Sequence, residues 1–305
     1  MYLYIANMGE DIVERVDLEK NHRDFAKINS YNNKHLLLNV YSKYLCGPHR
    51  LILDKQRGKL YSLNAYDNSI SIINLEDFSS EGSLYIGNYP NSGILYKDYI
   101  LVVNGDSDSI SIFDVGDKKV IGQIKVGSYP QEIIYNEKYD MIFVSNMNFD
   151  EVLLIEPEYY RIVDFIITGA RPIGMTFSED WDYLYVVNSY FESGINGKVS
   201  IINLQNFKVT EEIEVGKVPT MVQKKGDFLY VLNSYSNTLC KVDLFTRQKK
   251  EVYCGEAPGY FCLYDKYAYV SSTEENSVNI INIEEMKVVK FIETRKEPHG
   301  LIIDW

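Results

Sequence analysis

Residues 183–190 read YLYVVNSY, and nearly the same phrase returns as FLYVLNSY at 228–235, with looser copies at 99–105 and 141–147. Aromatic and β-branched side chains in short runs favour β-strands. Each copy contains an asparagine at the end of the strand, and a short polar loop follows it. Because one strand-and-loop phrase recurs along the chain, we expect an architecture built from a repeated unit.

The asparagine of this phrase recurs with a regular period. Its positions, completed by a serine in the last copy, are Asn7, Asn64, Asn104, Asn146, Asn188, Asn233 and Ser272. A proline column keeps the same period at Pro48, Pro90, Pro130, Pro172, Pro219, Pro258 and Pro298. Only Pro157 lies outside it. Two residue types that share a period of about forty residues indicate the blades of a β-propeller.

Each unit separates into strands. Residues 130–169 contain EIIY, MIFVSN, EVLLIEP and IVDFIIT, joined by polar turns and loops. No stretch shows the apolar period of a helix. The sequence therefore predicts an all-β, seven-bladed β-propeller of four-stranded antiparallel blades, in a single domain that spans residues 1–305.

The two ends of the chain predict how the ring closes. The chain begins on an Asn-ended strand at residues 2–7 and ends on a strand that follows Pro298. Residues 299–304 should therefore supply the innermost strand of the blade whose other strands come from residues 2–46. Closure of this kind removes open sheet edges, which otherwise invite aggregation.

The repeats also resemble the YVTN-type β-propellers, and the resemblance covers the entire chain. The matching parts are YVVNS, VSIINL at 199–204 and IEVGKVP at 213–219. The resemblance implies the seven-bladed fold and says little about function, because the repeat encodes blades. Relatives in the wider propeller world look like lactonases and antibiotic lyases, which use His, Glu or a divalent metal over the central channel.

The repeated columns are interpreted as architecture. The asparagine is expected to hydrogen-bond neighbouring backbone groups at the start of a loop. A glycine that stands three residues before most of the prolines is expected to adopt a positive φ as the chain crosses to the next blade. The proline suits the first residue of a strand, because it donates no hydrogen bond.

The first unit is the longest. Asn7 and Asn64 are 57 residues apart, against 39 to 45 in the other units. We assign the excess to residues 19–35, between the third and the outermost strand. Its polar composition predicts a segment that projects outward, away from the channel mouth, and is more mobile than the blade cores.

One face of the propeller is expected to carry the function. The turns between blades and the loops after each second strand lie on the same face, around the mouth of the central channel. His49 and His299 follow their prolines and should lie side by side there. In an enzyme they would be catalytic, with Glu297 orienting a proton, because histidine titrates near neutral pH. The alternative is that each ring hydrogen-bonds a neighbouring backbone carbonyl.

Further side chains on this face are candidates for ligand binding. They are Asn91, Tyr129, Gln131 and Arg171 beside the prolines, and Tyr66, Tyr190 and Tyr235 in the loops. Arg171 would supply a fork for a carboxylate. Aromatic side chains among acidic loop residues suit a cationic, aromatic or basic-peptide partner. Acidic residues also simply keep loops hydrated.

Composition excludes several classes. The formal net charge of −12 and the lack of a basic patch disfavour nucleic acid. No apolar run has the length of a membrane span, and the N-terminus lacks the features of a signal peptide, so we expect a cytoplasmic protein without a membrane partner. Cys240 and Cys254 are expected to be buried thiols. Two histidines without a third ligand make no zinc site, so no metal or cofactor is expected.

These observations predict a monomeric ligand- or protein-binding scaffold that uses the acidic, aromatic face around the channel. Its partner would be a peptide, a protein or a small molecule. The alternative is a lactonase-, lyase- or hydrolase-like enzyme with a channel-mouth site built on His49 and His299.

Overall fold

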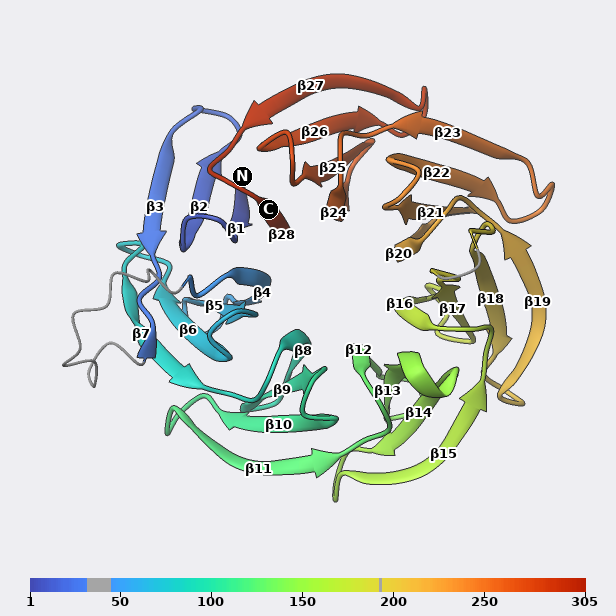
Figure 1. Ribbon diagram of the computed structural model, residues 1–305, viewed down its shortest axis with the longest axis horizontal. Helices are drawn as coiled ribbons and strands as arrows, with labels where there is room; N and C mark the ends of the chain where they lie inside the picture. Colours follow the sequence, from blue (N-terminus) through green and yellow to red (C-terminus); the bar gives the residue numbers. More distant parts are fainter. Residues whose placement is uncertain (32–44, 192–193) are drawn as a thin grey trace.

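The computed structural model describes residues 1–31, 45–191 and 194–305, which form a ring of seven blades (Figure 1). Each blade is a four-stranded antiparallel sheet, so the predicted all-β, seven-bladed propeller is confirmed. The strands are given from the channel outward: blade 1 has β28 (Pro298–Asp304), β1 (Tyr2–Asn7), β2 (Ile12–Asp17) and β3 (Arg23–Lys27), and blade 2 has β4 (Pro48–Asp54), β5 (Lys59–Asn64), β6 (Ser69–Asn74) and β7 (Ser80–Tyr85). Blade 3 has β8 (Pro90–Tyr96), β9 (Tyr99–Asn104), β10 (Ser109–Asp114) and β11 (Lys119–Lys125), blade 4 has β12 (Pro130–Asn136), β13 (Met141–Asn146), β14 (Glu151–Glu156) and β15 (Arg161–Ile167), and blade 5 has β16 (Pro172–Phe177), β17 (Tyr183–Asn188), β18 (Lys198–Asn203) and β19 (Lys208–Glu214). Blade 6 has β20 (Pro219–Lys225), β21 (Phe228–Asn233), β22 (Thr238–Asp243) and β23 (Lys249–Tyr253), and blade 7 has β24 (Pro258–Tyr264), β25 (Tyr267–Ser272), β26 (Ser277–Asn282) and β27 (Lys287–Glu293).

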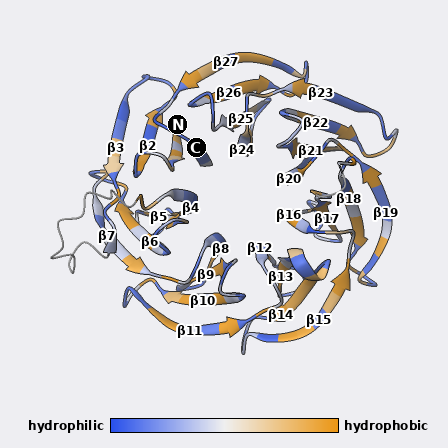
Figure 2. Ribbon diagram, viewed as in Figure 1, coloured by the Kyte–Doolittle hydropathy of each residue, from blue (hydrophilic) through white to orange (hydrophobic). Residues whose placement is uncertain are grey.

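The hydrophobic core lies between neighbouring blades. Val103 and Ile110 of blade 3, for example, pack in one cluster with Ile133 and Val144 of blade 4. The second strand of each blade is buried almost throughout, because neighbouring blades cover both of its faces, whereas outer strands such as β11 are mostly exposed. Hydrophobic residues accordingly recur along the strands all around the ring (Figure 2).

The chain ends meet in blade 1. β28 pairs antiparallel with β1, with Leu3 opposite Ile303 and Ile5 opposite Leu301. It also contacts β4 of blade 2 and β24 of blade 7. The N- and C-termini therefore lie close together in Figure 1. The predicted closure by the C-terminal strand is confirmed.

The asparagine column is structural, as predicted. Asn188 is fully buried, and its Nδ2 donates to the carbonyl of Val186 at 3.3 Å and to the Ser200 hydroxyl at 2.7 Å. Asn104 makes the same type of contact with Ser111, at 2.9 Å. The side chain thus ties the end of the second strand to the third strand of its own blade.

The expected role of the glycine column is corrected. Within it only Gly87 and Gly255 have a positive φ, of 141° and 106°. Elsewhere the glycine leaves room for the buried asparagine: a Cβ on Gly127 would lie 2.2 Å from Nδ2 of Asn146. The positive φ belongs instead to the residue directly before each proline, where it ranges from 49° at Ala257 to 69° at Gly47.

A further column, which the sequence did not suggest, holds these turns. The side-chain oxygens of Asp108 and Asp150 accept hydrogen bonds, each of 2.8 Å, from the N–H groups of Tyr129 and Arg171, the residues before the next prolines. Asn276 does the same for Glu297 at 2.9 Å. These acidic and amide groups fix the entry into each innermost strand.

The predicted position of the insertion is wrong. Residues 23–27 form β3, the outermost strand of blade 1, with Ala26 opposite Val13. The extra length therefore follows the outermost strand and lies between β3 and β4. An exposed outer strand such as RDFAK needs little apolar alternation, which is why its sequence was taken for part of a loop. The outward projection and greater mobility of residues 19–35 stay predictions, and residues 32–35 of this segment lie outside the described residues.

The four cysteines are free thiols, and Cys240 and Cys254 are buried, as expected. Cys240 lies opposite Glu251 in the ladder between β22 and β23. Burial raises the pKa of both thiols to about 12, so neither is a reactive thiolate. Across the described parts of the chain, no helix is long and apolar enough to cross a membrane.

Candidate functional site

Backbone hydrogen bonds assemble the predicted face. The residue that follows the Asn-ended strand donates its N–H to the carbonyl of the residue before the proline of the same blade. Gly105 donates to Tyr89 at 2.8 Å, and Ser234 donates to Val218 at 2.9 Å. Loops and inter-blade turns therefore share one end of the channel, as expected from the repeat.

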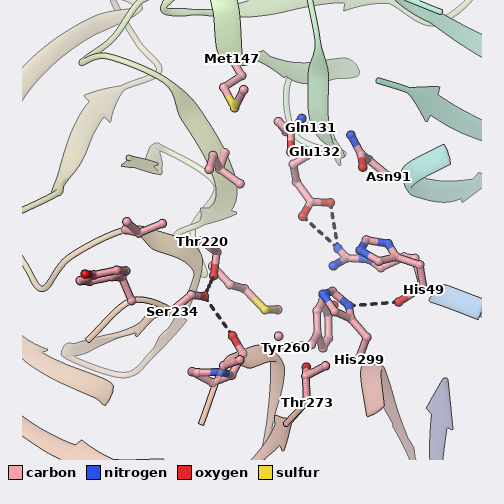
Figure 3. A pocket seen from close by; sticks show the side chains of 18 of the residues that line it. His49, Asn91, Gln131, Glu132, Met147, Thr220, Ser234, Tyr260, Thr273 and His299 are labelled. Atoms are coloured by element: carbon pink, nitrogen blue, oxygen red, sulfur yellow. Dashed lines mark hydrogen bonds and ion pairs between the residues drawn. The ribbon is translucent and has the colours of Figure 1, made fainter. Parts of the chain in front are cut away.

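A cavity of about 710 Å³ opens at this end of the channel (Figure 3). Every blade contributes to its wall, and we call it the mouth cavity. One lining residue from each blade, in blade order, is His299, His49, Asn91, Gln131, Ile173, Thr220 and Tyr260.

A bulge at the start of the innermost strands brings two successive side chains to this cavity. In β4, Pro48 lies opposite Asn64 and Arg50 opposite Leu63, so the inner strand uses one residue more than its partner. A bulge changes the direction of a side chain in this way. Both His49 and Arg50 therefore line the cavity.

An ion pair spans blades within the cavity wall. Nη2 of Arg50 in blade 2 lies 2.9 Å from each carboxylate oxygen of Glu132 in blade 4. The hydroxyl of Ser92, in the intervening blade, also donates to Glu132. The guanidinium carbon lies 4.4 Å from the ring centroid of Tyr260 in blade 7. One charged pair thus joins four of the seven blades across the channel.

His49 and His299 do lie side by side. Their ring centroids are 4.0 Å apart and the rings are inclined by 26°. Nδ1 of His299 donates to the backbone carbonyl of His49 at 3.3 Å. The buried Nδ1 of His49 has no hydrogen-bond partner among the described residues. The carbonyl-bonding alternative therefore holds for His299.

The pKa of each ring is lowered, which disfavours an acid–base pair that works near neutral pH. Burial, followed by the positive charge of Arg50, lowers the pKa of His299 to about 4. Burial and the neighbouring His299 lower the pKa of His49 well below its ordinary value of 6.5. Both imidazoles are accordingly neutral at pH 7.

These shifts predict a pH dependence of stability. A histidine whose pKa is lowered by folding binds more protons in the unfolded chain, so the free energy of unfolding should fall as the pH drops from about 6.5 towards 4. In urea titrations across this pH window, the free energy of unfolding of His299→Asn should fall by about 2 kcal/mol less than that of the wild type. Parallel curves for wild type and His299→Asn would contradict the assignment.

Four of the predicted ligand-binding residues line the mouth cavity, namely Asn91, Tyr129, Gln131 and Tyr235. The Asn91 amide donates to the backbone carbonyl of Pro130 at 3.0 Å, so it also joins blades 3 and 4. Nε2 of Gln131 is buried without a partner among the described residues. Tyr129 stacks against Tyr89, with ring centroids 6.3 Å apart. Tyr235 is 72% exposed at the rim.

The other predicted site residues do not belong to the cavity wall: Tyr66, Arg171, Tyr190 and Glu297. The carboxyl group of Glu297 lies beside Gly9, in the loop after β1. The Tyr66 ring covers Gly47, and the Arg171 guanidinium carbon lies 5.8 Å from the ring centroid of Phe191. The structure therefore does not bring Glu297 and Arg171 together with the histidines in this wall.

The strongest polar feature of the cavity, the pair Arg50–Glu132, was missed. Its signal was present in the second residue after each proline: Arg50, Ser92, Glu132, Gly174, Met221, Tyr260 and Gly300. Only two members of that column carry a charge, and the charges are opposite. Within the described residues, no group of three or more His, Cys, Asp or Glu side chains is placed to hold a metal ion.

Comparison with known proteins identifies the fold alone. No protein-family model matches the chain, and no curated protein matches it. Among solved structures it is similar to Kuenenia stuttgartiensis hydrazine synthase, with a TM-score of 0.73 and 17% identity over 87% of this chain and 91% of that one. It is also similar to a functionally unknown protein from Desulfotomaculum acetoxidans DSM 771, with a TM-score of 0.77 and 12% identity over 99% and 98% of the two chains.

A third similar structure is the dihydro-heme d1 dehydrogenase NirN in complex with DHE, with a TM-score of 0.64 and 13% identity. The match covers 99% of this chain and 74% of that one. At these identities the likeness supports the propeller scaffold and carries no activity across.

Proposed function

We propose that this protein is a binding propeller whose mouth cavity holds a small molecule. The observation that carries the proposal is the convergence of side chains from every blade on one hollow of about 710 Å³. Pockets for small ligands typically measure about 300–1,000 Å³. A molecule in this hollow would contact several rigid blades at once, which limits the reorganisation that binding requires.

Unpaired polar atoms in the wall support the same conclusion. Nδ1 of His49 and Nε2 of Gln131 have no hydrogen-bond partner among the described residues. An unsatisfied buried polar group costs about 1–3 kcal/mol. Such groups are rare in folded proteins and are expected where a ligand or an ordered water completes the structure.

Binding is favoured over acid–base catalysis by the state of the titratable groups. The lowered pKa of His49 and His299 makes both rings weak bases at pH 7. Glu297, the expected proton-orienting group, is not part of the cavity wall. The charges of Arg50 and Glu132 offset each other. A small molecule is favoured over a peptide or protein because the site is a hollow.

We also infer that the chain is a YVTN-type propeller, because the Tyr-Val-x-Asn strand, the VSIINL strand and the Gly-x-x-Pro turn recur around the ring. This inference concerns ancestry and adds nothing to the choice of ligand. The cytoplasmic location, the monomeric state and the absence of a nucleic-acid partner stay predictions.

Filling the cavity should abolish binding and leave the fold intact. Ile173 lines the hollow at the start of β16, so Ile173→Trp should occupy ligand space. In a thermal-shift screen of a metabolite library, compounds that raise the melting temperature of the wild type should fail with this variant. The same compounds should still raise the melting temperature of Ile121→Trp, a matched control on the exposed strand β11. A screen in which every stabilising compound also stabilises Ile173→Trp would refute the site.

A further inference from the structure

The serine and threonine hydroxyls of the mouth cavity are already used in hydrogen bonds within the wall. The hydroxyl of Thr220 pairs with that of Ser234 at 2.8 Å, and Ser234 donates to the carbonyl of Pro258 at 2.9 Å. Thr273 donates to the carbonyl of Pro298 at 3.0 Å. Ser234 and Thr273 thus join neighbouring blades, and Thr220 pairs within blade 6, so these three hydroxyls contribute little to the recognition of a ligand.

Arg50 also offers unpaired donors, in addition to the unpaired Nδ1 of His49 and Nε2 of Gln131. Only its Nη2 bonds to Glu132, and its Nε and Nη1 donate to no acceptor among the described residues. Tyr260 packs over the guanidinium. The side chain lines the cavity and keeps 18% of its surface exposed. It therefore offers hydrogen-bond donors at a fixed position.

The charges of the cavity wall cancel. Among the described residues that line it, Arg50 and Glu132 are the only charged ones, and they are paired. The Glu132 carboxylate is already held by Arg50 and Ser92. A charged ligand would therefore lose its hydration without finding an unpaired opposite charge. The net charge of −12 further disfavours anions.

Part of the cavity wall is apolar. Met147, Ile173, Val218 and Met221 line it, from blades 4, 5 and 6. In Figure 3, Thr220 and Ser234 of blade 6 lie across the pocket from His49 and His299. Methionine side chains adapt to flat rings and make favourable contacts with them. The hollow thus offers both hydrogen-bond donors and apolar surface.

We infer that the ligand of the mouth cavity is an uncharged aromatic molecule with a carbonyl-type oxygen. The oxygen accepts a hydrogen bond from the Arg50 guanidinium, and the ring lies against Met147 and Met221. This inference rests on the proposed binding function and adds the chemical class of the ligand and its orientation.

Three probes of nearly equal shape test the class: benzamide, benzoate and benzamidinium. Each is titrated into the full-length protein while NMR follows the ring signals of His49 and His299. Benzamide should shift these signals and bind about tenfold more tightly than either charged probe, because only the charged probes lose hydration without compensation. Tighter binding of benzoate or benzamidinium with the same shifts would overturn the class and leave the proposed site standing. If no probe shifts either ring, both the class and the small-molecule site are wrong.

A double variant tests the role of Arg50. Arg50→Met with Glu132→Gln removes both charges together. This double variant should bind benzamide about tenfold more weakly, because the guanidinium donors are lost. Arg57→Met is the matched control. Arg57 lies in the turn between β4 and β5 and pairs with Asp54 and Asp98. Unchanged benzamide affinity in the double variant would overturn the assignment.

The orientation is tested in the wild-type chain, which requires no variant to fold. With labelled methionine methyl groups, the ring protons of benzamide should show nuclear Overhauser contacts to Met147 and Met221. Contacts only to methionines outside the cavity wall, such as Met8 or Met141, would place the probe elsewhere and refute the orientation.

Discussion

Deletion of residues 298–305 is expected to leave the propeller open and the protein insoluble or unfolded at room temperature. The deletion removes the whole of β28, which pairs with β1 and contacts β4 and β24. Leu301 and Ile303 are buried, and each contributes about 1.5–3 kcal/mol when fully buried. Together with the lost ladder this approaches the total stability of a typical domain, about 5–15 kcal/mol.

The loss of soluble, folded protein should be specific to the removal of β28. Removal of the exposed Trp305 alone should leave the melting temperature close to that of the wild type. A synthetic peptide of residues 298–304, added during refolding of the truncated chain, should restore soluble protein. A truncated chain that remains monomeric with an unchanged melting temperature would show that blade 1 is not closed by the C-terminal strand.

Removal of one partner of the ion pair Arg50–Glu132 is expected to be the most destabilising single change in the cavity wall. Arg50→Met leaves the carboxylate of Glu132, whose side chain is only 12% exposed, without its counter-ion. Breaking a pair at such a site costs about 3 kcal/mol or more. The double variant, Arg50→Met with Glu132→Gln, should cost less than Arg50→Met alone, because it leaves no unpaired charge.

Urea denaturation of the wild type, both single variants and the double variant measures this coupling. A control cycle on the exposed pair Lys119–Asp117 should show about 0–1 kcal/mol of interaction. Additive costs for Arg50→Met and Glu132→Gln would mean that the pair does not join blades 2 and 4.

The blades could be predicted because their signal is periodic. A buried asparagine, or serine in blade 7, and a strand-starting proline recur in each blade, so the number of blades and the closing strand followed from counting them. The insertion was misplaced for the opposite reason. The outermost strand β3 has one exposed side and polar residues, so its sequence, RDFAK, carries little of the strand pattern.

The candidate site was predicted only in part. His49 and His299 were found because they directly follow a proline, and that position faces the mouth in every blade. Arg50 and Glu132 were missed because a two-residue alternation would turn the next side chain away from the cavity. The bulge after the proline brings it back. The pair Arg50–Glu132 also joins blades 2 and 4, which are separated by blade 3, and no local spacing in the sequence encodes such a contact.

The most direct test of a ligand site at the channel mouth is a crystal structure of the protein soaked with benzamide or with a concentrated metabolite extract. We expect density for a flat molecule that contacts Arg50, Met147 and Met221. The ligand or an ordered water should give a hydrogen-bond partner to Nε2 of Gln131 or to Nδ1 of His49. Density confined to another surface, or a mouth cavity that holds only solvent under both soaks, would contradict it.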